Sequence, residues 1–242
     1  MSLTKILGTF VVLFSVWYLY FAFIGDEVFS VGARGIAIVL LLLVYILKVN
    51  KTNFYFLSFL IFYAMGDLFN YFTWYANPNQ TESLDLIYYY VGNSIYILSY
   101  LSLSARLFSG LDKMLFRKKY ILYVILLLIL TAFCVYFISD ATSGFIDDSS
   151  FLVETLYNTV TIGLMCIAFL NYIVHDDSKS VNLMIGSVLI VFSEILQLAY
   201  FYVAEFIILH VICSVLFVLA FLFFYLQSLQ AYRKHTEYHY EV

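Results

Sequence analysis

The sequence predicts an all-α, polytopic transmembrane helix bundle of eight spans, forming a single membrane domain over residues 1–242. Composition is the first observation: 64% of the residues are hydrophobic, only 12% are charged, and the mean hydropathy is +0.95. The apolar residues also lie in continuous runs of about 20, the length that a helix needs to cross a ~30 Å hydrocarbon core. Short alternating segments, typical of a membrane barrel, are missing. Because lipid offers no partner to free backbone polar groups, we expect every span to be a helix.

Charged clusters separate eight candidate spans. They are residues 5–24, 33–49, 54–75, 86–107, 119–139, 151–173, 182–203 and 206–230. The first run is too long, and its end at residues 23–26 too poor in small residues, for a cleaved signal peptide, so we expect it to be retained. Only Ala204 and Glu205 separate the last two runs. A seven-span arrangement with a long, kinked last element is therefore the alternative.

Lysine and arginine residues fall almost entirely on one side of this arrangement. Arg34 alone is placed on the other side, at the outer mouth of the second span. The residues that share the majority side are Lys5, Lys48, Lys51, Arg106, Lys113, Arg117, Lys118, Lys119, Lys179, Arg233 and Lys234. The positive-inside rule puts that side in the cytoplasm, together with both termini. We expect a multi-pass protein of a bacterial inner membrane.

Several chemistries are excluded by the motifs that the sequence lacks. The three cysteines, Cys134, Cys166 and Cys213, lie inside apolar runs and form no CxxC pair, which argues against a metal site or a disulfide framework. There is no HExxH motif, glycine-rich phosphate loop or GxSxG elbow. The basic stretch at residues 117–119 is explained by membrane topology, so no nucleic-acid partner is expected.

Two carboxylic acids lie deep in the predicted spans. Asp67 is about 13 residues into the third span and Glu194 about 12 residues into the seventh, and these two spans run in the same direction. An ionisable group at that depth costs roughly 2.5–3.5 kcal/mol on insertion scales and usually marks a functional path. The plainer interpretation is that two protonated carboxyls hold neighbouring helices together. Two acids at matched depth exceed what packing needs, so we expect a functional site.

Further polar residues accompany both acids. Asn70 follows Asp67 by three residues and Gln197 follows Glu194 by three, so each pair shares one helix face. Because the two spans are four apart, the match is a faint sign of a parallel four-plus-four repeat with a site at the repeat interface. Other candidate binding residues in the outer half are Asn93, Tyr157, Asn158 and Arg34. An outer tyrosine is also typical of an aromatic belt, and a lone arginine of snorkelling.

A small residue followed by an acid occurs in both of these spans, as Gly66-Asp67 and as Ser193-Glu194. On these pairs the sequence resembles the YhhN family of membrane lysoplasmalogenases. Matching residues in spans four, six and eight are Gly92, Tyr96, Tyr100, Tyr157, Ile162, Met165, Ala168, Tyr225 and Gln227. Three positions depart from the family pattern: Glu194 replaces an aspartate, Arg34-Gly35 replaces Lys-Pro, and Ser99 stands near the place of a histidine. The serine cannot supply the histidine's acid–base chemistry.

The resemblance implies hydrolysis of the vinyl-ether bond of a lysoplasmalogen, a lysophospholipid of the bilayer, to a fatty aldehyde and a glycerophospho-base. In such a reaction one neutral carboxyl protonates the alkene carbon, and a second, ionised carboxyl stabilises the oxocarbenium-like cation and takes a proton from water. We assign Asp67 as the acid, Glu194 as the base and Arg34 to the lipid phosphate, with no metal or organic cofactor.

Another class of function uses the same carboxyls. A non-enzymatic membrane sensor or a proton-coupled transporter also needs buried acids, to relay protons or to bind a ligand. A purely structural bundle is the third alternative.

The predicted orientation is directly testable with reporter fusions. A reporter fused after Val242 should be cytoplasmic, and one inserted at Gly144 should be external, because the basic residues are concentrated on one side. A cytoplasmic signal from the Gly144 fusion would overturn the span assignment.

Overall fold

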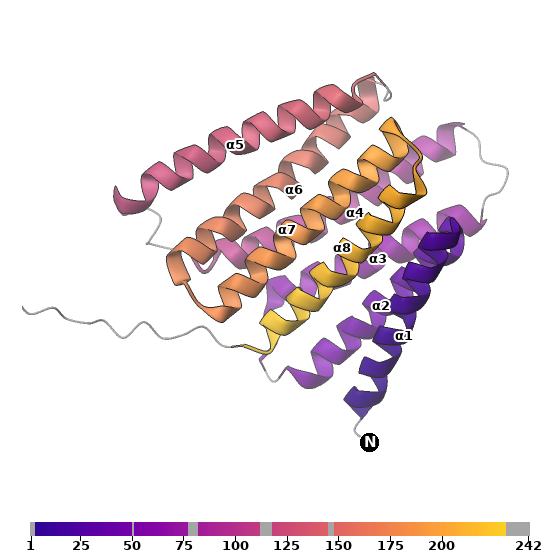
Figure 1. Cartoon of the computed structure of the whole chain (residues 1–242), viewed down its shortest axis with the longest axis horizontal. Coiled ribbons are helices and arrows are strands. Elements are labelled where there is room, and N and C mark those ends of the chain that lie inside the picture. Colours follow the sequence, from indigo (N-terminus) through magenta and orange to yellow (C-terminus); the bar gives the residue numbers. More distant parts are fainter. Residues whose placement is uncertain (1–2, 50, 77–81, 112–117, 145–147, 231–242) are drawn as a thin grey trace, which may run out of the picture.

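The computed structural model describes residues 3–49, 51–76, 82–111, 118–144 and 148–230, and these form a bundle of helices (Figure 1). The α-helices are α1 (Leu3–Ile24), α2 (Glu27–Lys48), α3 (Phe54–Ala76), α4 (Glu82–Phe108), α5 (Lys118–Thr142), α6 (Asp148–His175), α7 (Ser178–Leu198) and α8 (Ile207–Ser228). The all-helical prediction is thus confirmed for the described residues. Seven of these helices are long and apolar enough to cross a membrane, and α4 is the exception. The chain is therefore a multi-pass membrane protein.

The start of α2 differs most from the prediction. The helix begins at Glu27 rather than at residue 33, and the Asp26 side chain caps it by accepting a 3.1 Å hydrogen bond from the backbone N–H of Phe29. Arg34 consequently lies two turns inside the helix, where it is 7% exposed. The prediction that Arg34 lies at the end of the span was wrong, because the helix begins with the turn that Asp26 caps, before Arg34.

The boundary between α7 and α8 is resolved as a true break. A π-helical turn, Ala199–Val203, follows α7, and Ala204 is extended before α8 begins. The two helices pack closely against each other along the bundle (Figure 1). Separate helices are therefore confirmed over a single long, kinked element.

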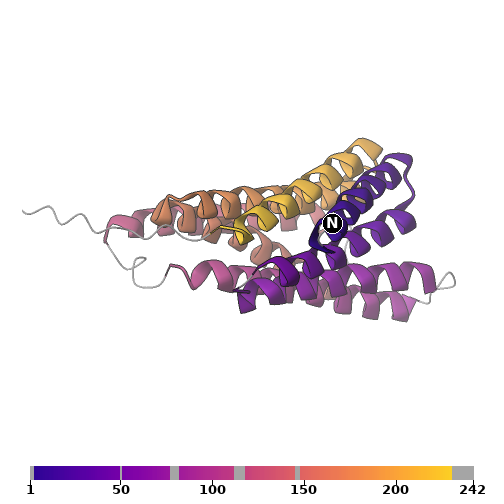
Figure 2. The same ribbon diagram turned by 90° about the horizontal axis from the view of Figure 1, so that it is seen from below.

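Most of the helices form a closed ring. Around the ring α1, α2, α3, α4, α6, α7 and α8 contact one another in that order, and α8 returns to α1. Figure 2 shows α3 and α4 on one side of the bundle and α7 and α8 on the other. α5 lies outside the ring and packs against α6, with a surface exposed along the whole span. In a parallel four-plus-four repeat, α1 and α5 would occupy equivalent places. α1 belongs to the ring and α5 does not, so the repeat stays a prediction.

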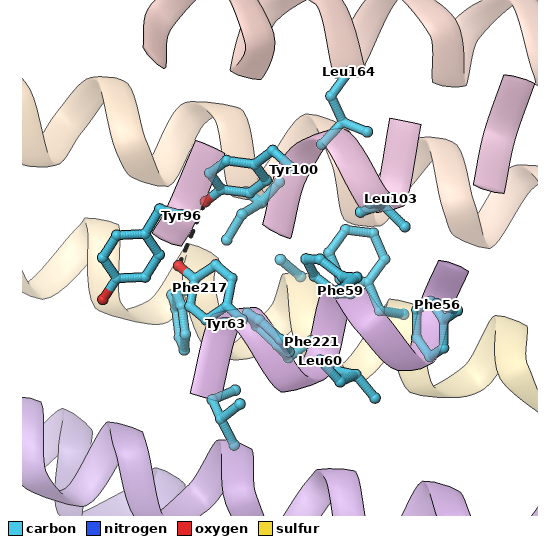
Figure 3. Packing of buried hydrophobic residues seen from close by; sticks show 14 of the residues in the cluster. Phe56, Phe59, Leu60, Tyr63, Tyr96, Tyr100, Leu103, Leu164, Phe217 and Phe221 are labelled. Atoms are coloured by element: carbon cyan, nitrogen blue, oxygen red, sulfur yellow. Dashed lines mark hydrogen bonds between the residues drawn. The ribbon is translucent and has the colours of Figure 1, made fainter. Parts of the chain in front are cut away.

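An aromatic core fills the space between the two sides of the ring (Figure 3). Phe59 of α3 stacks on Phe221 of α8 with ring centroids 5.8 Å apart, and Tyr63 meets the same ring edge-on at 4.9 Å. Lipid tails are as apolar as these side chains, so close packing holds such helices together. Gly186 of α7 provides one close approach, because an added Cβ would lie 2.7 Å from the Phe224 ring.

Gly186 therefore generates a stability prediction. Gly186→Ala should lower the thermal unfolding midpoint in detergent, because overpacking costs about 1–3 kcal/mol while the gain in helix propensity is under about 1 kcal/mol. Gly163→Ala in α6 is the matched control, since nothing lies within 4 Å of its added methyl group. Equal midpoints for the two variants would contradict the packing described for α7 and α8.

Candidate functional site

A buried ion pair joins α2 to α3. Arg34 Nη2 lies 2.8 Å from Asp67 Oδ1, and the same oxygen accepts a 2.7 Å hydrogen bond from the Tyr96 hydroxyl of α4. Asn70 Nδ2 donates to the Tyr96 hydroxyl at 3.1 Å, and the Arg34 guanidinium lies 5.1 Å from the centre of the Phe217 ring. Asp67 is fully buried. Two donors on this oxygen suit Asp67 as a charged counterion of Arg34, and its other oxygen, Oδ2, is buried without a hydrogen-bond partner among the described residues.

Two glycines allow this network to form. A Cβ added at Gly66 would lie 2.8 Å from the Tyr96 ring, so only glycine lets that ring lie against α3 with its hydroxyl on Asp67. A Cβ at Gly35 would lie 3.4 Å from the Cβ of Asp67, so α2 and α3 also approach closely beside Arg34. The small residue before the acid in the third span thus has a packing reason.

Glu194 of α7 is surrounded by tyrosine hydroxyls. Tyr157 of α6 donates to its Oε2 at 2.7 Å, while Tyr63 (3.3 Å) and Tyr100 both donate to its Oε1. The hydroxyls of Tyr63 and Tyr100 are themselves 3.5 Å apart, as drawn in Figure 3. An ionised carboxylate only accepts hydrogen bonds, so three donors suit a charged Glu194. Ser193 fixes this part of α7 by donating to the Cys213 carbonyl of α8 at 2.7 Å.

A polar cavity of about 540 Å³ lies next to Glu194, and the tyrosines Tyr63 and Tyr157 form its floor. Of the predicted site residues, those that line it are Arg34, Asn70, Asn93, Tyr157, Glu194 and Gln197. Asp67 does not line it, because Arg34 and Tyr96 lie between its carboxylate and the cavity. The two predicted acids thus lie in separate hydrogen-bond networks, whose tyrosines Tyr96 and Tyr63 meet edge-on with ring centroids 5.1 Å apart, and of the two acids only Glu194 lines the cavity.

An apolar cavity of about 730 Å³ lies next to the polar one, between α1, α2 and α8. Tyr18 and Arg34 line both cavities, so these two residues mark the junction. Val12 and Val16 of α1 line the apolar cavity and are 62% and 56% exposed on the outside of the bundle. The wall that α1 contributes to the apolar cavity therefore includes exposed side chains.

Two further residues lie away from the cavity: the predicted binding residue Asn158, and Ser99, which stands near the place of the family's histidine. Asn158 is buried in α6 without lining it. The Ser99 hydroxyl is fully buried and donates to the Phe59 carbonyl at 2.9 Å, so it joins α4 to α3. Ser99 therefore has a packing role in this structure.

Three acids outside the predicted site residues line the polar cavity, Glu27, Asp85 and Glu154, and Glu154 is the most deeply buried of them. Glu154 lies near the start of α6, and its Oε2 accepts a 2.8 Å hydrogen bond from the Tyr89 hydroxyl of α4. The signal was its spacing, since Tyr157 and Asn158 follow it at three and four residues and place it on the same helix face.

Comparisons with protein-family models, with curated proteins and with solved structures find no match to this chain. The resemblance to the YhhN family stays a prediction, and the site itself is the basis for inferring function.

The Arg34–Asp67 pair should show strong energetic coupling. Asp67→Asn leaves a buried cation without its counterion, which typically costs about 3–5 kcal/mol. The double variant Arg34→Gln/Asp67→Asn should be less destabilised than the sum of the two single changes, as measured by unfolding in lipid nanodiscs. Asp85→Asn, at an exposed position, is the control and should change little. Strictly additive effects would contradict the buried pair.

Proposed function

We propose that this protein is a membrane hydrolase that cleaves the vinyl-ether bond of a lysoplasmalogen. The observation that carries the proposal is the junction of a polar and an apolar cavity at Tyr18 and Arg34. A lysolipid has one polar head group and one hydrocarbon chain, so two adjoining cavities of unlike polarity suit it. Both volumes fall within the roughly 300–1,000 Å³ of small-molecule sites.

The length of the apolar cavity supports a long hydrocarbon chain. Its lining runs along α1 from Thr4 to Tyr18, and 14 residues at 1.5 Å each make about 21 Å. Half of a ~30 Å bilayer core is about 15 Å, so the cavity accommodates a chain that spans one leaflet. A chain held there would place the first carbons next to the head group at the junction.

The polar cavity offers suitable chemistry at that point. Cleavage begins when a proton adds to the alkene carbon that is not bonded to oxygen. This leaves a cation on the alkene carbon that is bonded to oxygen. A carboxylate can stabilise this cation and take a proton from the attacking water, as in glycosidases. We assign this role to Glu194, and Arg34 to the phosphate of the head group. Asp67 holds Arg34 in place, since its carboxylate has no access to the cavity.

The packing below Glu194 favours the hydrolase over a proton-coupled transporter. Tyr63 and Tyr100 pack against fully buried apolar side chains (Figure 3). These apolar side chains lie between the tyrosines and the end of the bundle that carries Lys5 and Lys48. They include Phe59, Leu60, Leu103, Leu107 and Phe224. Within the described residues, the space that continues from the polar cavity toward that end is the apolar cavity, which is lined mainly by apolar side chains, whereas proton transport needs a polar path to both sides.

We also propose that α4 is a span, which makes eight, with both termini in the cytoplasm. α4 packs between α3 and α6 in the ring and has 27 residues, enough to cross the bilayer. Among the described residues, every lysine and arginine except Arg34 lies at or next to a helix end on one side of the bundle. Lys113, Arg117, Arg233 and Lys234 lie outside the described residues.

Glu194 generates the activity prediction. Purified protein given a lysoplasmalogen should release a fatty aldehyde, and Glu194→Gln should lower that rate by about 10²–10⁴-fold. The amide keeps the shape of the side chain but can neither stabilise the cation nor take a proton from water. Aldehyde release is measured directly by chemical trapping and mass spectrometry.

Glu205→Gln is the matched control, because Glu205 is exposed before α8 and does not line the polar cavity. It should retain wild-type activity. The absence of aldehyde from folded wild-type protein, across several head groups, would count against the hydrolase.

A further inference from the structure

Glu154 is one of four carboxyl groups that line the polar cavity, together with Glu27, Asp85 and Glu194. Its side chain is only 4% exposed, and its Oε2 is held by the Tyr89 hydroxyl at 2.8 Å. Its Oε1 is buried and has no hydrogen-bond partner among the described residues. Other buried polar atoms also lack a partner among the described residues, including Asp67 Oδ2 and Asn158 Nδ2, so it is the place of Glu154 in the cavity wall that sets it apart.

The position of Glu154 relative to Glu194 is set by α6. Tyr157 lies one turn further along that helix, about 4.5 Å of rise, and donates to Glu194 Oε2 at 2.7 Å. Glu154 and Glu194 thus lie on adjoining parts of one cavity wall, with Tyr157 between them. Their surroundings differ: three hydroxyls donate to Glu194, whereas one hydroxyl, that of Tyr89, donates to Glu154, which also has the Asn158 side chain as a polar neighbour. Two acids in unlike surroundings are the arrangement that divides acid and base roles.

We propose that Glu154 is the proton donor for vinyl-ether cleavage, an inference that rests on the proposed function. The O–H bond of neutral Glu154 breaks as a C–H bond forms at the alkene carbon that is not bonded to oxygen. The cation develops beside the Glu194 carboxylate. Water then adds to the cationic carbon and gives a proton to Glu194, which leaves a hemiacetal. The hemiacetal collapses as its hydroxyl proton passes to Glu154 and the departing glycerol oxygen takes a proton from Glu194. Both carboxyls regain their first state, with one water consumed.

The other ionisable side chains in the cavity suit this role less well. Glu27 accepts a 3.0 Å hydrogen bond from Tyr200 and, like Asp85, lies toward the exposed outer end. Both ring nitrogens of His210 are buried without a hydrogen-bond partner among the described residues. A protonated imidazole needs acceptors for two N–H groups, so these surroundings suit a neutral ring rather than an acid.

The test uses full-length protein in nanodiscs and compares aldehyde release with lipid binding. Glu154→Gln should lower the single-turnover rate by at least about 100-fold. It should still bind a saturated 1-O-alkyl lysolipid as wild type does. The amide keeps the size and shape of the side chain in the cavity wall but has no acidic proton. The wild-type rate should fall at high pH, as a general acid loses its proton, and Glu154→Gln should lack this fall. Glu205→Gln is again the control.

Each outcome decides between the two claims. Wild-type aldehyde release with Glu154→Gln within about tenfold of wild type would overturn the role of Glu154 and leave the hydrolase standing. Loss of activity in His210→Gln but not in Glu154→Gln would do the same. No aldehyde from wild-type protein that binds the alkyl lysolipid would overturn the hydrolase and this inference together. If Glu154→Gln fails to fold, Tyr89→Phe keeps the acid and removes its one hydrogen bond, and it should shift the high-pH fall; an unchanged profile would contradict the proposal.

Discussion

The ion pair between Arg34 and Asp67 is the interaction on which the rest of the site depends. A cation inside an apolar helical bundle is tolerated only with a counterion and further hydrogen bonds. Asp67 and Tyr96 supply both, and Gly66 lets the Tyr96 ring lie close enough to do so. The pair joins α2 to α3 and the tyrosine joins α4 to them. Arg34 is thereby fixed at the junction of the two cavities, where one positive charge can meet a lipid phosphate.

Tyrosine hydroxyls donate most of the hydrogen bonds that the buried acids accept. A phenol offers a hydrogen-bond donor on a large apolar ring, so it packs in the core without adding a charge. Tyr63, Tyr100 and Tyr157 share Glu194, and Tyr89 holds Glu154. The rings of Tyr63, Tyr100 and Tyr157 also belong to the hydrophobic core of the bundle. A polar chamber can therefore exist beside an apolar one within a single ring of helices.

The helices could be predicted from the sequence because each apolar run matches the thickness of a bilayer. The start of α2 could not, since Gly25, Asp26 and Glu27 predict a loop that runs up to Arg34, although the Asp26 cap was the signal of an earlier helix start. The depth of Asp67 and Glu194 follows from counting residues. Which of them faces open space depends on how α3 is rotated against α2 and α4, and a linear pattern does not contain that rotation. Glu154 was overlooked because carboxylates are common near the end of a span.

The most direct test of the central claim is an experimental structure with a saturated 1-O-alkyl lysolipid bound, since this ether cannot be cleaved by protonation. The account predicts the phosphate beside Arg34 in the polar cavity and the chain along α1, α2 and α8, so that the ether oxygen lies within reach of Glu194. A lipid bound elsewhere, or a head group at the Lys48 end with the polar cavity holding only water, would contradict it.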